Sequence, residues 1–179
     1  MTAVVHAAAV GRTAVTPQAL RTVARCLPAC VTVVTSGQGA ALHGMTVSSF
    51  TTLSLAPPLV SFSVMDGARI RSVVETSGGF TVNVLGAEQA ALARWFASSE
   101  RPTGAASFAG VELADEPVAS GAVLAGALAY FACGPVRLVE AGDHVIAIGT
   151  VERCRTLRDG MPLIFEGGGF RHLGPVLEE

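Results

Sequence analysis

The chain has 179 residues, most simply one domain that is long enough to bury a substantial core. Half of its residues are hydrophobic and 15% are charged, and 12 basic against 14 acidic residues give a formal net charge of −2. Non-specific nucleic-acid binding needs a strongly basic surface, so we expect no nucleic-acid partner.

Two stretches without Asp, Glu, Lys or Arg, residues 26–65 and 117–136, have to be considered as membrane spans. Ser, Thr, Gly and Pro interrupt both, which favours buried strands joined by turns over a lipid-facing helix. Residues 1–15 lack a basic segment and are expected to be a flexible leader rather than a secretory signal, followed by a single domain over 16–179. We expect no membrane association.

The four cysteines, Cys26, Cys30, Cys133 and Cys154, form no CxxC pair and no disulfide-dense spacing. This spacing is typical of a reduced, cytoplasmic protein. Together with the four histidines the cysteines form no group at metal-ligand spacing, so no metal site is predicted.

Strand patterns dominate the chain after one N-terminal helix. Thr16 as N-cap and Pro17 at the first helical position predict a helix that ends near Pro28. Its apolar residues at helical spacing, which we expect to pack inward, are Leu20, Val23, Ala24 and Leu27. Strands are predicted over 31–35, 41–55 (bent at Gly44), 59–65, 80–85, 127–139, 144–154, 163–165 and 170–173. Further helices are predicted over 66–76, with Asp66 as N-cap, and over 88–98, while 99–107 reads as a surface loop.

Short turns at 36–39 and 141–143 favour antiparallel hairpins. Two-residue alternation places Val60, Phe62 and Val64 on one face of their strand. The predicted fold is therefore mostly β with short helices, antiparallel and Greek-key-like. Closing the sheet into a barrel is the economical way to remove the edges of so many strands.

The uncharged segment 44–52, GMTVSSFTT, has two interpretations. It is a Ser/Thr-rich strand, or it is a wall of neutral hydrogen-bonding groups for a polar, planar ligand such as a flavin ring. Arg69, in the first turn of a predicted helix, is either an exposed surface arginine or the partner of a flavin phosphate. His144, after Gly142 and Asp143, is either a surface histidine or a donor beside a bound ligand, and His43 is a weaker candidate of the same kind.

Several segments in order resemble the flavin reductase family, the small reductase components of two-component flavin-dependent monooxygenases. They are LPACVTVVT (27–35), HGMTVSSFT (43–51), LAPPLV (55–60), FTVNVL (80–85), LARWFA (92–97), GDH (142–144) and FEGGGFR (165–171). The resemblance extends over about residues 16–173.

This resemblance implies an FMN-binding split β-barrel, a homodimer, and reduction of FMN or FAD by NADH or NADPH for a separate monooxygenase. Carried over by position, the flavin ring would lie along Thr46, Val47, Ser48, Ser49 and Thr52, and its ribityl phosphate along Ser63, Ala68 and Arg69. Further flavin contacts would be Asn83, Trp95, Phe96 and Ala97, with Gly142, Asp143, His144 and Phe170 on the nicotinamide side. Among these, His144 is the candidate catalytic residue, which would position the nicotinamide.

The chain departs from the family pattern at Cys30, at the Ala68-Arg69 pair and at Ser107. The first departure concerns the fit of a turn, and the other two concern how the phosphate end is held. Two other functions remain open: an oxidase that keeps FMN tightly bound, and a non-catalytic barrel that binds flavin or haem. A purely structural barrel would bind no flavin at all.

Overall fold

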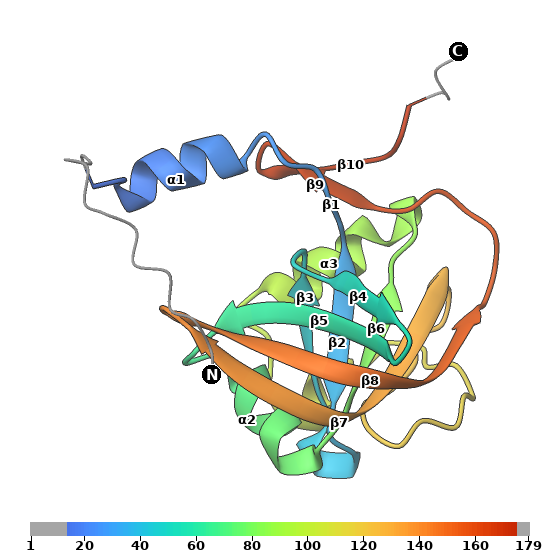
Figure 1. Ribbon diagram of the computed structural model, residues 1–179. Coiled ribbons are helices and arrows are strands. Elements are labelled where there is room, and N and C mark those ends of the chain that lie inside the picture. The colour runs from blue at the N-terminus through green and yellow to red at the C-terminus, as the bar shows by residue number, and fades with distance from the viewer. Residues whose placement is uncertain (1–13, 175–179) are drawn as a thin grey trace, which may run out of the picture.

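The structure, a computed structural model, describes residues 14–174 (Figure 1). Its α-helices are α1 (Pro17–Ala24), α2 (Arg69–Ser77) and α3 (Ala90–Ala97), and its 3-10 helices are η1 (Gly39–Ala41), η2 (Ala87–Gln89) and η3 (Gly104–Phe108). Its strands are β1 (Ala29–Cys30), β2 (Thr32–Ser36), β3 (His43–Val47), β4 (Thr51–Leu55), β5 (Pro58–Met65), β6 (Phe80–Val84), β7 (Ala129–Ala141), β8 (His144–Thr156), β9 (Ile164–Glu166) and β10 (Gly169–Arg171). Nearly all of the predicted leader, residues 1–13, lies outside the described residues.

Seven strands form one antiparallel sheet in the order β3-β2-β6-β7-β8-β5-β4, and β1, β9 and β10 form a second, small sheet. The edge strands β3 and β4 are consecutive and joined only by residues 48–50, so the large sheet has to curl until its edges approach each other. The Ser49 hydroxyl stabilises this curl, because it accepts a hydrogen bond from the Ser63 amide (2.9 Å) and donates one to the Ser63 carbonyl (2.8 Å). The predicted mostly β, antiparallel fold is confirmed.

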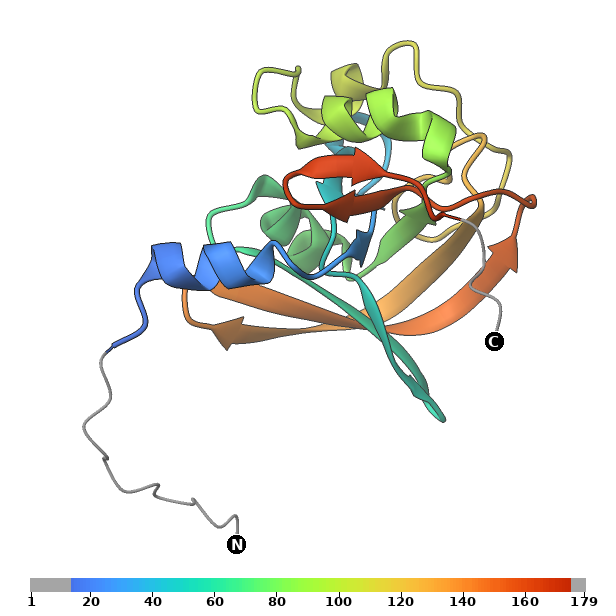
Figure 2. The same ribbon diagram turned by 90° about the horizontal axis from the view of Figure 1, so that it is seen from above.

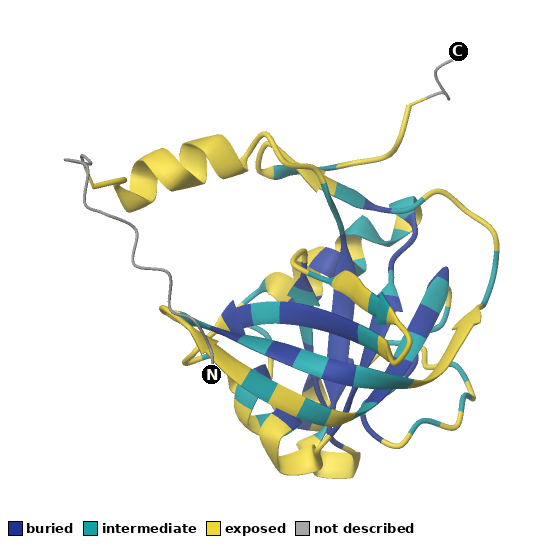
Figure 3. Cartoon of the chain, in the orientation of Figure 1, coloured by how far each residue is buried: buried dark blue, intermediate teal, exposed yellow. Residues whose placement is uncertain are grey.

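Two large apolar clusters and a smaller one that contains Tyr130 fill the interior, and Figure 3 shows the buried segments in dark blue along the strands. Inside the curled sheet, Phe62 packs edge-on against Phe80 with ring centroids 4.9 Å apart, beside Val60 and Val64. The alternation predicted for β5 is therefore confirmed. Under α3, a second cluster contains Phe96 and Phe108. Both clusters bury several large side chains completely, and burial of this kind is the main driving force for folding.

The N-terminal helix differs from its prediction. Its start is confirmed, because the Thr16 hydroxyl accepts a hydrogen bond from the Ala19 amide (3.2 Å), but it ends at Ala24. No residue of α1 is buried, and the side chains of Leu20 and Val23 are 63% and 69% exposed. The expectation that one face packs inward is wrong for the described chain, because α1 extends away from the barrel (Figures 1 and 2).

Three other predicted boundaries also need correction. The single strand expected over 41–55 is divided into β3 and β4 by the 48–50 crossover. Helix α2 begins at Arg69 with Ala68 as N-cap and no side-chain cap, because residues 65–68 form a turn in which the Ala68 amide bonds to the Met65 carbonyl (2.9 Å). The Asp66 carboxylate pairs with Arg71 instead (3.2 Å). The segment expected as a surface loop contains η3, whose Ser107 is buried. No helix within residues 14–174 is long and apolar enough to cross a membrane.

Candidate functional site

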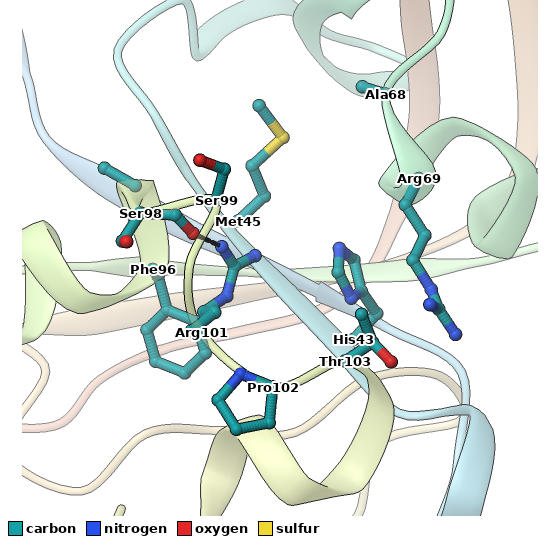
Figure 4. Close-up of a pocket in the computed structure, with 11 residues that line it drawn as sticks. His43, Met45, Ala68, Arg69, Phe96, Ser98, Ser99, Arg101, Pro102 and Thr103 are labelled. Carbon is teal, nitrogen blue, oxygen red and sulfur yellow. Dashed lines mark hydrogen bonds between the residues drawn. The ribbon is translucent and has the colours of Figure 1, made fainter.

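A pocket of about 290 Å³ opens between β3, the start of α2 and the segment that follows α3 (Figure 4). We call it the cationic pocket, because Arg69 and Arg101 lie on its wall and no carboxylate does. Its lining residues are His43, Met45, Ala68, Arg69, Phe96, Ala97, Ser98, Ser99, Arg101, Pro102 and Thr103.

Strand periodicity and one glycine form the β3 wall of this pocket. His43 and Met45, two residues apart, lie on the same face of β3 and both line the pocket. Gly44 lies between them, and a Cβ there would come within 2.7 Å of the Phe96 ring and 3.0 Å of the Phe108 ring. Because glycine has no side chain, α3 can pack closely against β3 at this point.

The two arginines are held differently. Arg101 donates hydrogen bonds to the Ser98 and Gly44 carbonyls, and its guanidinium lies 5.8 Å from the centre of the Phe96 ring. Arg69 is exposed at the first residue of α2, where free backbone N–H groups and the helix dipole favour an anion. Its guanidinium has no hydrogen-bond or ion-pair partner recorded among the described residues. The pocket therefore has one fixed and one free cation.

His43 is 6% exposed, and its Nδ1 is buried without a hydrogen-bond partner in the described structure. Burial, followed by the positive charges of Arg101 and Arg69, lowers its pKa to about 4. The imidazole is therefore neutral near pH 7. The weaker of the two histidine candidates thus lies inside the pocket, between two cations.

The structure brings part of the predicted flavin site together. Ala68, Arg69, Phe96 and Ala97 all line the cationic pocket, as the phosphate and flavin-contact predictions require. Ser63 is half-buried on β5, close to the connection after β3 through its bonds to Ser49.

The predicted hydroxyl wall is only partly available to a ligand. The Thr46 hydroxyl donates to the Ala93 carbonyl of α3 (2.7 Å), and the Ser49 hydroxyl is bonded to β5. Val47 is 4% exposed. Ser48 and Thr52 are exposed, so among the residues of this wall their hydroxyls are the accessible ones.

The polar side-chain atoms of Asn83 and Trp95 have hydrogen-bond partners inside the protein. Asn83 is fully buried, and its amide nitrogen donates to the Val33 and Ala122 carbonyls (3.2 and 3.1 Å) while its oxygen accepts from the Leu124 amide (2.8 Å). The Trp95 indole donates to the Ser107 carbonyl (2.7 Å) and attaches η3 to α3. Asn83 therefore holds the loop before β7 against the sheet, and its role as a flavin contact stays a prediction.

The four residues predicted for the nicotinamide side lie outside the cationic pocket. Gly142 has φ +69° in the exposed turn between β7 and β8, which suits a glycine. His144 pairs with Met65 in the sheet register, so this turn lies beside the segment that leads into α2. The His144 Nδ1 is 2.7 Å from the Asp143 carboxylate, and this hydrogen bond lowers the pKa of Asp143.

Phe170 is separate from that turn. It is half-buried on β10, packs against the cluster under α3, and lies beneath the Arg94 guanidinium, 5.1 Å from its ring centre. His144 is the first residue of β8. The structure thus places the predicted nicotinamide residues on two different elements.

Sequence reasoning missed Arg101 and the 98–103 segment. Residues 99–107 have no periodicity, and an arginine in an apparent surface loop gives no signal of its own. Within residues 14–174, no group of three or more His, Cys, Asp or Glu residues is arranged to hold a metal.

The cationic pocket fits a phosphate. Two guanidinium groups face it, no carboxylate lines it, and two buried nitrogens, His43 Nδ1 and Arg101 Nε, have no partner among the described residues. Its volume lies at the lower end of the range for small-molecule sites, so it holds a part of a cofactor rather than a whole dinucleotide. A second hollow of about 610 Å³ adjoins it, with Arg69 on the wall of both.

A curled antiparallel sheet with a cationic pocket at its edge suits a small, mostly β protein that binds a phosphate-bearing ligand. Residues 24–174 match the family described as "Flavin reductase like domain". An NADH-dependent FAD reductase of Streptomyces globisporus is 40% identical over 162 residues, which cover 89% of this chain and 87% of that protein. The chain therefore belongs to the flavin reductase like domain family, which confirms the resemblance seen in its motifs.

Two other proteins extend this comparison. The reductase subunit of a flavin-dependent monooxygenase from Rhodococcus jostii is 34% identical over 167 residues, 93% of this chain and 83% of that one. The solved structure of an NADH:FAD oxidoreductase from Streptomyces globisporus, in complex with NAD and FAD fragments, superimposes with a TM-score of 0.82 at 35% identity. The match covers 93% of this chain and 100% of that one.

Proposed function

We propose that this protein is an NAD(P)H:flavin oxidoreductase, which reduces FMN or FAD with NADH or NADPH and supplies the reduced flavin to a separate monooxygenase. The observation that carries this proposal is the cationic pocket, whose wall includes His43 and Met45 of β3, the strand that leads to the exposed Ser48. A cofactor that has both a phosphate and a planar, neutral ring matches the cationic pocket and the adjoining strand β3. The relatives named as flavin reductases support the same activity.

Residues of this chain would hold the flavin at two places. Arg69 and Arg101 face the phosphate end in the cationic pocket. β3 is an edge strand of the large sheet, so every second residue turns its N–H and C=O away from β2, where they have no ladder partner and suit the polar edge of the ring. Ser48 and Thr52 offer hydroxyls at the same edge.

When bound, the nicotinamide supplies a hydride and the flavin accepts it, so the redox chemistry belongs to the cofactors. The protein's part is to fix the two rings in contact and to limit water around them. We assign no proton transfer in the reduction itself to a side chain of the pocket.

The activity is tested by anaerobic stopped-flow absorbance at the flavin band, with FMN and FAD each mixed with NADH and with NADPH. We expect rapid, enzyme-dependent bleaching for at least one pair. Tight flavin retention through purification without such bleaching would favour the oxidase. Bound flavin or haem without turnover would favour a non-catalytic binding barrel, and no binding at all would leave a structural role.

His144 is proposed to orient the nicotinamide from the β7–β8 turn, where Asp143 holds its ring. Replacing His144 with alanine should raise KM for NADH by about three- to tenfold, the value of one ordinary hydrogen bond, and change kcat less. Steady-state kinetics at saturating flavin measure this effect. Unchanged KM and kcat would remove His144 from the site.

We further propose that the protein is a homodimer in which a second copy covers the exposed apolar side of α1. Leu20, Val23 and Leu27 are 63–71% exposed there, and the β4–β5 hairpin adds Leu55 at 92%. Figure 2 shows both α1 and this hairpin projecting from the body. Exposed apolar surface of this kind is typical of an interface.

The double variant Leu20→Glu and Val23→Glu should convert a dimer to a monomer, because two charges cannot be buried unpaired in an apolar interface. Light scattering after size-exclusion chromatography measures the mass of each species. Leu113→Glu, which places one charge on an exposed leucine in the loop before β7, is the control and should remain dimeric. A monomeric wild type would contradict the proposal.

A cytoplasmic location completes the proposal. It is supported by the four cysteines, which are all free in the structure, because reduced thiols persist in that compartment. Alkylation of protein taken directly from cells should modify thiols at all four positions once the chain is unfolded.

A further inference from the structure

His43 is a polar side chain of the cationic pocket to which neither the fold nor the proposed reaction gives a role. It is 6% exposed on β3, lines the pocket, and has a buried Nδ1 with no partner among residues 14–174. A buried polar atom of this kind is costly unless something satisfies it. In Figure 4 the imidazole ring is drawn between the side chains of Arg101 and Arg69.

The charged groups around His43 are all positive. Arg69 faces it from α2 and Arg101 from the segment after α3. Its neighbour across the ladder on β2 is Ser36, whose hydroxyl is occupied by the Gly79 carbonyl (2.7 Å), and α3 contributes Phe96 and Ala97 to the same wall. No Asp or Glu lines the pocket. Nothing in the described protein therefore compensates a proton on His43.

A phosphate placed between the two arginines would reverse this balance. Like charges at short range disfavour the imidazolium, whereas a dianion at the same distance favours it by a comparable amount. The partly buried position strengthens both effects relative to water. The burial that keeps His43 neutral in the empty pocket thus makes it responsive to an anion.

We propose that His43 is a third phosphate-binding side chain, which takes up a proton when the phosphate of a flavin nucleotide settles between Arg69 and Arg101. This inference rests on the proposed flavin reductase function and adds to it a proton-linked step in cofactor binding. Protonated, the imidazole donates from both ring nitrogens, which gives the phosphate a donor that is absent from the free protein.

The consequence is a pH-dependent affinity. In the free protein the pKa of His43 is about 4, so the histidine is neutral throughout the physiological range. If the bound histidine is protonated, affinity rises as pH falls, by up to about tenfold for each pH unit, until the pH approaches the pKa of the free state. Flavin nucleotides would then bind more tightly at pH 6.5 than at pH 8.

The test is isothermal titration calorimetry at pH 7.0 with FMN, in phosphate-free buffers of different ionisation enthalpy. The dependence of the heat on the buffer counts the protons exchanged on binding. We expect net proton uptake for FMN, and none for riboflavin, which has the same ring without a phosphate. Because the second pKa of a phosphate monoester is about 6, most FMN is already a dianion at this pH and takes up little itself.

The matched variants are His43→Asn and, as control, His172→Asn, which makes the same change at an exposed histidine on the C-terminal side of β10. His43→Asn should lose the proton uptake and bind FMN about tenfold more weakly, with riboflavin affinity changed less than about twofold. His172→Asn should behave as the wild type.

Two results overturn the inference: an FMN titration of the wild type with no more proton uptake than riboflavin, or equal uptake by His43→Asn. The first needs no variant, so it holds even if His43→Asn does not fold. Neither result affects the proposed function, provided that FMN still binds and is reduced. Failure of both FMN and FAD to bind to folded wild type would instead reject the proposed function, and this inference with it.

Discussion

Replacing Arg69 with alanine is expected to weaken FMN binding by about 10- to 100-fold, the range for a lost hydrogen bond to a charged group. Arg69 lies at the first residue of α2, lines the cationic pocket, and has no competing protein partner recorded in the described chain. Its interaction energy is therefore available to a ligand. Riboflavin, without a phosphate, should bind nearly as it does to the wild type, and fluorescence titration of both ligands measures the difference.

Arg137→Ala is the matched control for this prediction. Arg137 is exposed on β7 and lies outside the cationic pocket, so its removal changes the net charge equally without touching the site. It should leave FMN affinity within about twofold of the wild type. Equal weakening by both variants would reduce the effect of Arg69 to general electrostatics. Equal weakening of FMN and riboflavin by Arg69→Ala would place the phosphate elsewhere.

Replacing Asn83 with alanine should destabilise the fold by about 2–4 kcal/mol, because the buried Leu124 amide and two carbonyls lose their partner together. For a chain of this size the melting temperature should fall by about 5–15 °C. Asn83 attaches the loop before β7 to the large sheet, and it has no free polar atom for a ligand. Flavin affinity of the folded fraction should therefore remain close to that of the wild type.

Gln38→Ala tests the same loop from its exposed side. The Gln38 side chain donates to the Ala119 carbonyl (2.9 Å) in contact with solvent, so its loss should cost less than about 1 kcal/mol. Thermal unfolding and FMN titration of both variants separate structure from binding. Normal stability with lost FMN binding in Asn83→Ala would restore the role that the family resemblance implies for this residue.

The local pattern predicted most of the elements correctly. β5 shows why: Val60, Phe62 and Val64 alternate with serines, and one face of a strand is buried whatever its neighbours are. The start of α1 was equally local, since Thr16 caps the helix through an amide three residues away. Arg69 was predicted from its place in the first turn of a helix, and positions 68, 96 and 97 from the family resemblance; all four line the cationic pocket.

Long-range contacts decided the rest. The hydrogen-bond partner of the Thr46 hydroxyl is 47 residues away in the chain, and those of the Asn83 amide nitrogen are 39 and 50 residues away. The sequence therefore does not tell whether such a polar side chain is paired inside the protein or free for a ligand. The pocket itself forms only when the curled sheet, α2 and the segment after α3 meet, which brings Arg101 and His43 beside Arg69. Amino-acid type and spacing determine which secondary structure a segment can form. The free energy of a polar side chain depends on which distant groups surround it, and folding alone supplies those neighbours.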